Sequence, residues 1–544
     1  MTSRQALPNM TDNQKNNNHK RAVHFAIMIL LVVSSLAAPN PAAPSGSLPS
    51  LMIVEGTIPR LQQALLHDRV HCTELLSAYL QRIDAYDKSS AINAFIALNP
   101  QAMEQAQEID ARLREGRQLG RLFCVPLAVK DNYDVQGMAT TAGSKALQNN
   151  FPPDNAFMIQ RLMDEDAIVL GKTNMAEFAC CASHSYSSMG GTVRNPYDRS
   201  LTTGGSSGGT AAALATSMAL VGLGTDTGSS IRGPASHTSL VGLRPTMGRT
   251  SRDGIVPLSL ERDIGGPMAR TVQDAALLFS VMAGRDGRDP ITLEAPGVPK
   301  TIALSPEALK GQGIGLLSGL AKMSLNGDIG DPRVLALFQQ AISDMQKGGA
   351  RMVHVDDMSV RTTYQQVHTC DTFLYDMDNY LHSTGAQASY ASVFDLAQSH
   401  LYGPLVGYLF NEVQPDPVAP PSCMAAPAGD INQNPGMAAL RQQLVETMDR
   451  FGLAALAFPT YNVPPQPLDI PGDPPNNTGN NNYLAPFSGL PAISVPMGFV
   501  DGKPVGMQLL GRPFKEPLLL NLAYAYEHRT NHRKPPTGFP PVWR

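Results

Sequence analysis

Two serine-bearing glycine clusters constrain this 544-residue chain more than any other feature. Residues 203–213 have the sequence TGGSSGGTAAA, and residues 224–234 have the sequence GTDTGSSIRGP. Glycine has no Cβ, so such loops can turn sharply and bring backbone N–H groups close to a bound molecule. The alanines after the first cluster predict a tightly packed helix. Taken alone, the first cluster is equally compatible with a flexible Gly/Ser linker.

A third segment, residues 125–131 with the sequence VPLAVKD, places a lysine at the end of a short apolar run. The run predicts a buried strand, so Lys130 is expected at a strand end near the core. Burial disfavours the ammonium form and lowers the pKa of a lysine. A neutral lysine can accept a proton, and a serine hydroxyl needs such a base to become a good nucleophile.

These three segments resemble the motifs of the amidase signature family: a proline-containing strand ending in lysine, a GGSSGG loop and a GTDxGxSIR segment. Lys130 lies 76 residues before Ser206, which lies 24 residues before Ser230, and both separations are similar to the family's. The resemblance continues in GKTNMAEF, NPYD, VGLRPT and GPMAR, at residues 171–178, 195–198, 241–246 and 266–270, and near the C-terminus at 489–496 and 506–513. It covers nearly the whole chain after about residue 53.

The resemblance implies a catalytic set in which Ser230 is the nucleophile, Ser206 is a bridging serine with a cis peptide bond, and Lys130 is the base. A proton then passes from Ser230 through Ser206 to neutral Lys130, and the acyl group is held on Ser230 as an ester. The resemblance also implies an oxyanion hole made by backbone N–H groups of the turn that leads into the nucleophile. That turn comprises Thr227, Gly228, Ser229 and Ser230.

The sequence departs from the family's pattern at this turn. Many members have Gly-Gly-Ser where this chain has Gly228-Ser229-Ser230. A side chain at position 229 narrows the backbone conformations that the turn can adopt. Both serines are therefore nucleophile candidates, and Ser230 is preferred because it directly precedes Ile231-Arg232, as the family's nucleophile does.

Other residues near the serines are expected to have supporting or substrate-binding roles, namely Ser207, Gly205, Asp226, Arg232 and Cys180. Asp226 and Arg232 carry opposite charges, so a structural ion pair is expected, with a direct substrate contact as the alternative. His184 and His237 are interpreted as pocket or surface residues rather than essential ones.

The neighbouring residues exclude two other motifs, a nucleophile elbow and a phosphate-binding loop. GSSGG at 205–209 matches a nucleophile elbow, but that motif needs a buried strand before it, and residues 198–203 are too polar for one. Gly171-Lys172-Thr173 matches the end of a phosphate-binding loop, but Asp166 stands where its first glycine belongs, so Lys172 is interpreted as structural.

Composition favours a globular protein with a large core, because 43% of residues are hydrophobic and 16% are charged. A net charge of −4 gives no indication of nucleic-acid binding. The sequence contains no run of eighteen apolar residues, so no ordinary membrane span is expected. The six cysteines show neither a disulfide framework nor a metal-binding spacing. No metal and no cofactor are expected.

The N-terminal segment has the layout of a secretory signal peptide. Lys20-Arg21 precede an apolar run, and Ser35-Leu36-Ala37 supply small residues for cleavage after Ala37. Residues 1–37 are therefore predicted to be a signal peptide and residues 38–52 a Pro/Ala/Ser linker. The mature protein is expected to be periplasmic or secreted, with an uncleaved N-terminal membrane anchor as the alternative.

Residues 53–544 are predicted to form a single α/β domain, since strand and helix patterns alternate from 121 to about 290. The amidase-signature fold implied by the resemblance has a large, twisted, mixed β-sheet with helices on both faces. Residues 356–440 resemble the family least and are expected to cover the active site, where loops commonly set specificity. Residues 472–482 are expected to form an exposed loop.

The resemblance implies an amidohydrolase that cleaves a carboxylic amide, with an aryl or alkyl amide as the first expectation. The same machinery in the family also serves carbamates, esters and peptide C-terminal amides. The expected partner is a small-molecule amide, with no nucleic acid, no stable membrane span after signal cleavage, and a homodimer as an option. The alternatives are a glutamyl-tRNA amidotransferase component of the A type, which works in the cytoplasm with fixed partners, and a binding protein with a dead site.

Overall fold

The computed structural model describes residues 48–542 apart from 181, 386–387, 416, 418–429, 431–432 and 469–477. Residues 49–544 form one compact unit, and the fold is that of this unit alone. The expected signal peptide and most of the expected linker lie outside the described residues, as do residues 472–477 of the loop expected to be exposed. The described end of that loop, residues 479–482, is buried, so the expectation of exposure is wrong there. The first described helix, α2 (Leu48–Ile53), begins inside the segment expected to be a linker.

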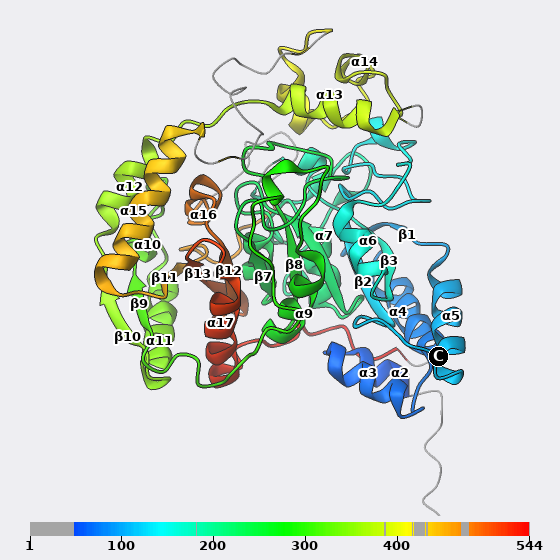
Figure 1. The fold of residues 1–544 in the computed structure, drawn as a ribbon, viewed down its shortest axis with the longest axis horizontal. Coiled ribbons are helices and arrows are strands. Elements are labelled where there is room, and N and C mark those ends of the chain that lie inside the picture. The colour runs from blue at the N-terminus through cyan, green and yellow to red at the C-terminus, as the bar shows by residue number, and fades with distance from the viewer. Residues whose placement is uncertain are drawn as a thin grey trace, which may run out of the picture. The chain divides into compact units, whose positions relative to one another are not determined.

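The centre of the unit is an eleven-stranded mixed sheet with the order β1-β3-β2-β6-β8-β7-β12-β13-β11-β9-β10 (Figure 1). Four neighbouring pairs are parallel, β2 with β3 and β6, and β9 with β10 and β11, while the other pairs are antiparallel. The predicted mixed α/β architecture is therefore confirmed. The strands are β1 (Phe95–Leu98), β2 (Val125–Lys130), β3 (Ala167–Thr173), β6 (Val221–Thr225), β7 (Val241–Arg244), β8 (Gly265–Ala269), β9 (Gly313–Leu316), β10 (Arg351–His354), β11 (Ala455–Pro459), β12 (Ala492–Val500) and β13 (Lys503–Gly511), with β4 (Tyr186–Ser187) and β5 (Gly191–Thr192) in a separate pair.

Helices surround this sheet. Every residue of β2, β3, β6, β7, β8 and β11 is buried, and successive strand residues point to opposite faces, so both faces of the central sheet are covered. The helices after α2 are α3 (Ile58–Leu66), α4 (Cys72–Tyr86), α5 (Ala102–Arg114), α6 (Phe157–Met163), α7 (Gly208–Ala215), α8 (Arg232–His237), α9 (Val272–Met282), α10 (Gly319–Lys322), α11 (Pro332–Lys347), α12 (Asp357–Gln365), α13 (Phe373–Thr384), α14 (Val393–Gln398), α15 (Pro435–Phe451), α16 (Leu484–Ser488) and α17 (Glu516–Thr530), with short 3-10 turns η1 (Lys145–Leu147), η2 (Glu177–Ala179), η3 (Pro290–Thr292) and η5 (Pro404–Phe410).

The parallel strands β2, β3 and β6 place the two glycine clusters at one edge of the sheet. Parallel neighbours need a crossover, and α6 connects β2 to β3 while α7 lies between β3 and β6 in the chain. The carboxyl ends of the three strands therefore meet at the same edge. That edge is where open α/β sheets commonly bind ligands.

The segment expected to cover the site, residues 356–440, divides into two parts. Its middle part, α13, α14 and η5, packs in an apolar cluster with Phe178 and Val256, and Figure 1 shows α13 and α14 at the top of the view. The flanking helices α12 and α15 instead contact one another and belong to a cluster with residues of β11 and α16. Within the described residues, only the middle part of this segment belongs to the cluster that contains Phe178.

A disulfide joins Cys72, at the start of α4, to Cys124, directly before β2. Cys370 is also disulfide-bonded, whereas Cys180 is a buried thiol. The spacing of the cysteines does not predict this disulfide. Cys72 and Cys124 are 52 positions apart in the sequence, and only the tertiary fold brings them together.

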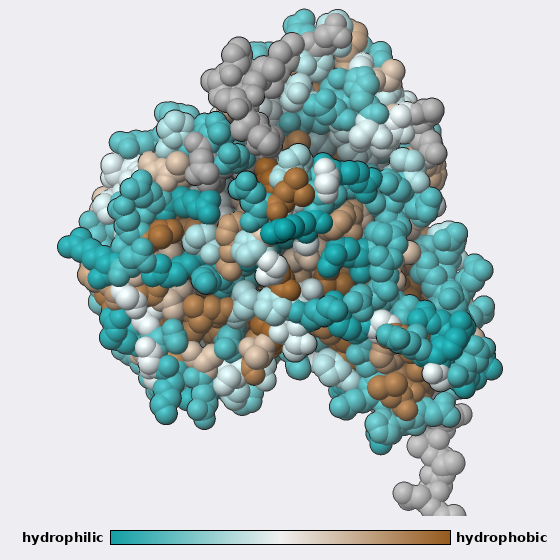
Figure 2. Space-filling view, in the orientation of Figure 1, coloured by the Kyte–Doolittle hydropathy of each residue, from teal (hydrophilic) through white to brown (hydrophobic). Residues whose placement is uncertain are grey.

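The described helices include none that is long and apolar enough to cross a membrane. On the face that Figure 2 shows, apolar residues occur in small groups separated by hydrophilic ones. This face therefore lacks the extended apolar patch that marks a large docking surface.

Candidate active site

Lys130 is the last residue of β2 and is completely buried. Its Nζ lies 2.7 Å from Ser206 Oγ and 2.7 Å from Thr225 Oγ1. Burial lowers the pKa of Lys130 from 10.5 to about 7, against the opposing attraction of Asp263 and Asp226. The lysine that the sequence places at a strand end thus meets the first serine cluster, and much of it is neutral near pH 7.

Ser206 lies on the loop that leads into α7, and its peptide bond with Gly205 is cis, as the family resemblance implies. The loop is held from the η2 side, because Gly205 N–H donates to Ala182 O at 2.8 Å and Ala176 N–H donates to Ser206 O at 3.1 Å. A Cβ at Gly209 would lie 2.2 Å from Asn174 O. The second glycine pair therefore allows α7 to approach this segment closely.

Ser230 follows β6 and precedes α8. Ser207 N–H donates to Ser230 O at 3.2 Å, which joins the two serine loops. In the described part of the chain no hydrogen bond links Ser206 Oγ directly to Ser230 Oγ. Such catalytic hydrogen bonds often tighten only when a substrate is bound.

The two nucleophile candidates differ in exposure. Ser230 is 4% exposed, whereas Ser229 is completely buried and its hydroxyl faces Tyr461 rather than solvent. A nucleophile must reach a substrate carbonyl, so the geometry favours Ser230, as the register against Ile231-Arg232 predicts.

The turn before Ser230 has the donors that an oxyanion hole requires. Among the described residues, the backbone N–H groups of Thr227, Gly228, Ser229 and Ser230 make no hydrogen bond within the chain. Thr227 Oγ1 donates to Asp263, which also accepts from two backbone N–H groups, and this fixes the start of the turn. Unused donors on a fixed turn match the geometry that stabilises a developing oxyanion.

Asp226 and Arg232 form a buried ion pair, which is the structural role expected for them rather than the alternative of a direct substrate contact. Arg232 donates to both Asp226 carboxylate oxygens at 3.0 Å and to Gly228 O at 3.0 Å. Burial alone would raise the pKa of Asp226, but Arg232 and Arg244 hold it below its ordinary value. Arg232 is fully buried and its donors are engaged by the protein, so it supports the turn structurally.

The remaining predicted site residues connect neighbouring segments. Ser207 Oγ donates to Thr225 O at 3.3 Å, and Cys180 Sγ lies 2.9 Å from the hydroxyl of Tyr408 in η5. His184 Nδ1 pairs with Ser183 Oγ at 3.0 Å. Burial lowers the pKa of His237 to about 3, so this imidazole is neutral and a poor proton acceptor.

Thr225 and Asn132 are site residues that the sequence interpretation did not single out. Thr225 Oγ1 lies between Lys130 Nζ and Asn132 Nδ2, at 2.7 and 3.1 Å. A neutral Lys130 amine that donates an N–H to Thr225 Oγ1 keeps its single lone pair available to accept a proton from Ser206. The position of Thr225 at the end of a strand parallel to β2 is the signal that could have identified it.

The described residues contain no group of three or more His, Cys, Asp or Glu that could hold a metal ion. The groups that the structure brings together at this edge are the Lys130 amine, two serines, unused backbone N–H groups and a buried ion pair.

Comparison with known proteins shows the family to which the chain belongs. The sequence profile of the amidase family matches residues 74–520. The glutamyl-tRNA(Gln) amidotransferase A subunit from Chlorobium chlorochromatii is 36% identical over 484 residues, which cover 85% of this chain and 97% of that protein. Its counterpart from Cenarchaeum symbiosum is 33% identical, with 86% and 95% covered.

Solved structures give the same result. The native peptide amidase of Stenotrophomonas maltophilia is 36% identical with a TM-score of 0.75, and the match covers 89% of this chain and 98% of that one. An amidase family protein of Bacillus anthracis is 28% identical with a TM-score of 0.73, with 94% and 97% covered. By the profile match, these sequence identities and the shared fold, this chain belongs to the amidase signature family, whose enzymes act on C–N bonds.

Proposed function

We propose that this protein hydrolyses carboxylic amides through an acyl-enzyme on Ser230. The observation that carries the proposal is the buried Lys130 amine, 2.7 Å from Ser206 Oγ, with a pKa lowered to about 7. A base that is neutral at physiological pH and in contact with a serine is what amide cleavage requires.

The first half of the reaction forms the ester. Ser230 Oγ attacks the amide carbonyl carbon while its proton passes through the Ser206 hydroxyl to Lys130 Nζ. The carbonyl oxygen becomes negative and accepts hydrogen bonds from unused N–H groups of the turn 227–230. The C–N bond then breaks as Lys130, through Ser206, returns the proton to the leaving nitrogen.

The second half releases the acid. A water molecule attacks the ester carbonyl and loses its proton along the same path to Lys130. The C–O bond to Ser230 breaks, and the proton returns to Ser230 Oγ. Lys130 thus serves as base and then acid in each half, for which a pKa near the working pH is best suited.

The substrate class is proposed from two directions. An aryl or alkyl amide follows from the family resemblance, with esters and carbamates as alternatives. The similarity to peptide amidases, at 36% identity over nearly the whole of those chains, adds C-terminal peptide amides as a class to test first. A screen of matched anilides, alkyl amides, peptide amides, esters and carbamates on the purified protein decides among them.

A second candidate is a component of a tRNA-dependent amidotransferase, because the curated relatives at 32–36% identity carry that name. The Cys72–Cys124 disulfide favours the hydrolase instead, since disulfides persist mainly in oxidising compartments. It also supports the proposal that the signal-like N-terminus directs export. Glutaminase activity that appears only with partner proteins and tRNA would favour the amidotransferase.

The nucleophile is tested by labelling with a fluorophosphonate, which phosphonylates an activated serine. We expect Ser230→Ala to lose both labelling and amide turnover, while Ser229→Ala keeps the label on Ser230 and retains measurable turnover. Mass spectrometry locates the label on the wild type. A label on Ser229 or Ser207 would refute the assignment, and a wild-type protein that is neither labelled nor active would refute the proposed function.

A further inference from the structure

Three buried polar side chains lie behind the serine loops without hydrogen-bond partners among the described residues. They are Ser229, Tyr461 and His237, which are 0, 3 and 4% exposed. The Ser229 hydroxyl, the Tyr461 hydroxyl and both His237 ring nitrogens are unpaired. Buried polar groups are nearly always paired in proteins, so three unpaired ones beside a reactive turn require an explanation.

These side chains connect the two loops. The His237 and Tyr461 rings pack with their centroids 4.4 Å apart. A Cβ on Gly233 would lie 3.0 Å from the Tyr461 hydroxyl and 3.6 Å from Ser229 Cβ, so that hydroxyl lies beside the first turn of α8 and near Ser229. A Cβ on Gly204 would lie 3.2 Å from His237 Nδ1, which places the imidazole against the loop that carries Ser206.

Packing alone does not account for the polar atoms. Phenylalanine at 461 would make the same ring contact with His237 without burying an unpaired hydroxyl. Glycine at 229, as the resemblance leads one to expect, would leave no buried hydroxyl there. Burial raises the pKa of the Tyr461 phenol while the Ser229 hydroxyl opposes that rise, which agrees with the two hydroxyls facing each other.

We propose that Tyr461 is a positioning residue for acyl transfer, acting through Ser229 to hold the turn 227–230 in place as the oxyanion forms. The two hydroxyls pair when the turn tightens around the negatively charged oxygen, and the neutral His237 ring keeps the Tyr461 ring in place. An interaction made only in the transition state raises kcat and leaves KM unchanged. This inference rests on the proposed function, since it needs an acyl transfer at Ser230.

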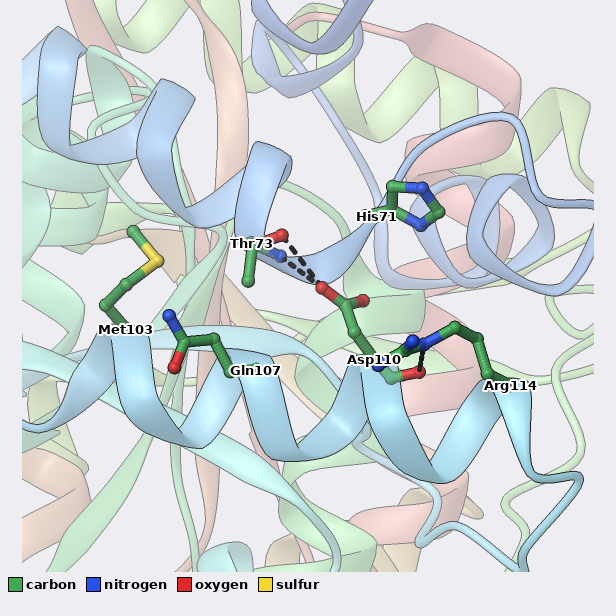
Figure 3. Close-up of a pocket in the computed structure, with 6 residues that line it drawn as sticks. All are labelled: His71, Thr73, Met103, Gln107, Asp110 and Arg114. Atoms are coloured by element: carbon green, nitrogen blue, oxygen red, sulfur yellow. Dashed lines mark hydrogen bonds between the residues drawn. The ribbon is translucent and has the colours of Figure 1, made fainter.

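The cavity between α4 and α5 is the other candidate for a binding site, but its described lining contains no buried polar group without a partner. It has a volume of about 460 Å³ and is lined by His71, Thr73, Met103, Gln107, Asp110 and Arg114 (Figure 3). The Asp110 carboxylate already accepts hydrogen bonds from the backbone N–H groups of Cys72 and Thr73 and from the Thr73 hydroxyl. The start of α4 is therefore capped by the protein itself and offers no site for a ligand.

The test removes single hydroxyl groups. We expect Tyr461→Phe to lower kcat about tenfold on the best amide, with KM unchanged within about twofold, which is less than the 10²–10³ typical of losing a direct oxyanion donor. The rate of fluorophosphonate labelling at Ser230 should fall in parallel. Ser229→Ala should have the same effect, and the double variant should lose no more than either single one, because the two groups act as a unit.

Tyr526→Phe is the matched control. Tyr526, in α17, is also completely buried, and its hydroxyl likewise has no partner in the described part of the chain. Removing that hydroxyl should leave kcat, KM and the labelling rate at wild-type values. Melting temperatures of all variants show whether any loss of rate arises from unfolding.

The outcomes distinguish failure of this inference from failure of the proposed function. An active wild type with a Tyr461→Phe variant of equal kcat and labelling rate overturns this inference alone. Losses that multiply in the double variant also overturn it, because Tyr461 would then act independently of Ser229. A wild type that is neither labelled nor active refutes the proposed function and the inference together.

Discussion

The lowered pKa of Lys130 makes a quantitative prediction about pH. A shift from 10.5 to about 7 corresponds to about 5 kcal/mol of preference for the neutral amine. At pH 7.5 an ordinary lysine is neutral in about one molecule in a thousand, whereas a group with a pKa of about 7 is neutral in about three quarters of molecules. Burial at the end of β2 thus multiplies the active form several hundredfold.

The assay is a pH–rate profile of kcat/KM, which reports ionisations of the free enzyme. We expect the rate to fall about tenfold per pH unit below about pH 6 and to level off above about pH 8, because only the neutral amine accepts the proton from Ser206. A free lysine would instead give a rise that continues to about pH 10.

Two substitutions identify Lys130 as the titrating group. Lys130→Ala should reduce amide hydrolysis by about 10²–10⁴-fold, the usual contribution of a general acid or base. A matched activated ester should lose less, because its leaving group needs no proton. Lys130→Arg should not restore activity, since arginine remains protonated.

A wild-type profile that is flat between pH 5 and 9, or a near-normal rate of amide hydrolysis in either variant, would show that Lys130 is not the base. The proton would then follow another path. His237 would be a poor substitute, because burial lowers its pKa to about 3.

Three further predictions concern stability and processing. Replacing Cys72 and Cys124 by serine should lower the free energy of unfolding by about 2–4 kcal/mol, because their disulfide restricts the unfolded chain over 52 residues; urea unfolding measures the loss, and an unchanged midpoint would contradict it. Arg232→Met should destabilise the fold by about 3–5 kcal/mol, because it removes the guanidinium that pairs with both oxygens of the buried Asp226 carboxylate and leaves Arg244 as its remaining ion-pair partner; wild-type stability in thermal unfolding would exclude the structural role. N-terminal sequencing of protein from the native host should find a mature start near Ala38, and an intact Met1 on cytoplasmic protein would rule out export.

Local patterns predicted the parts of the site that lie on short continuous segments. The apolar run before Lys130 is a fully buried strand, and the alanines after the first glycine cluster form α7. The opposite charges of Asp226 and Arg232, six residues apart, form an ion pair because the turn between them returns the chain on itself. In each case the segment carries its own periodicity, charge or turn residues.

The long-range contacts that the family's motifs do not imply were not predicted. The spacing of Cys72 and Cys124 contains no sign of their bond, and the motif at 224–234 does not reveal that Thr225 contacts Lys130. The expectation that residues 356–440 act as one cover did not anticipate that α12 and α15 pack in a different cluster from α13 and α14.

The sequence by itself determined the chemistry of this protein, because the lysine, the two serines and the glycines around them have residue types and separations that resemble one family. The tertiary structure decided what those groups can do. Burial of β2 on both faces lowers the pKa of Lys130, and the parallel pairing of β2 with β6 brings Thr225 to its amine. Tyr461 reaches the serine turn only because the chain returns to the sheet more than two hundred residues later. Desolvation and long-range contact depend on which surfaces pack together, and local sequence patterns do not encode that.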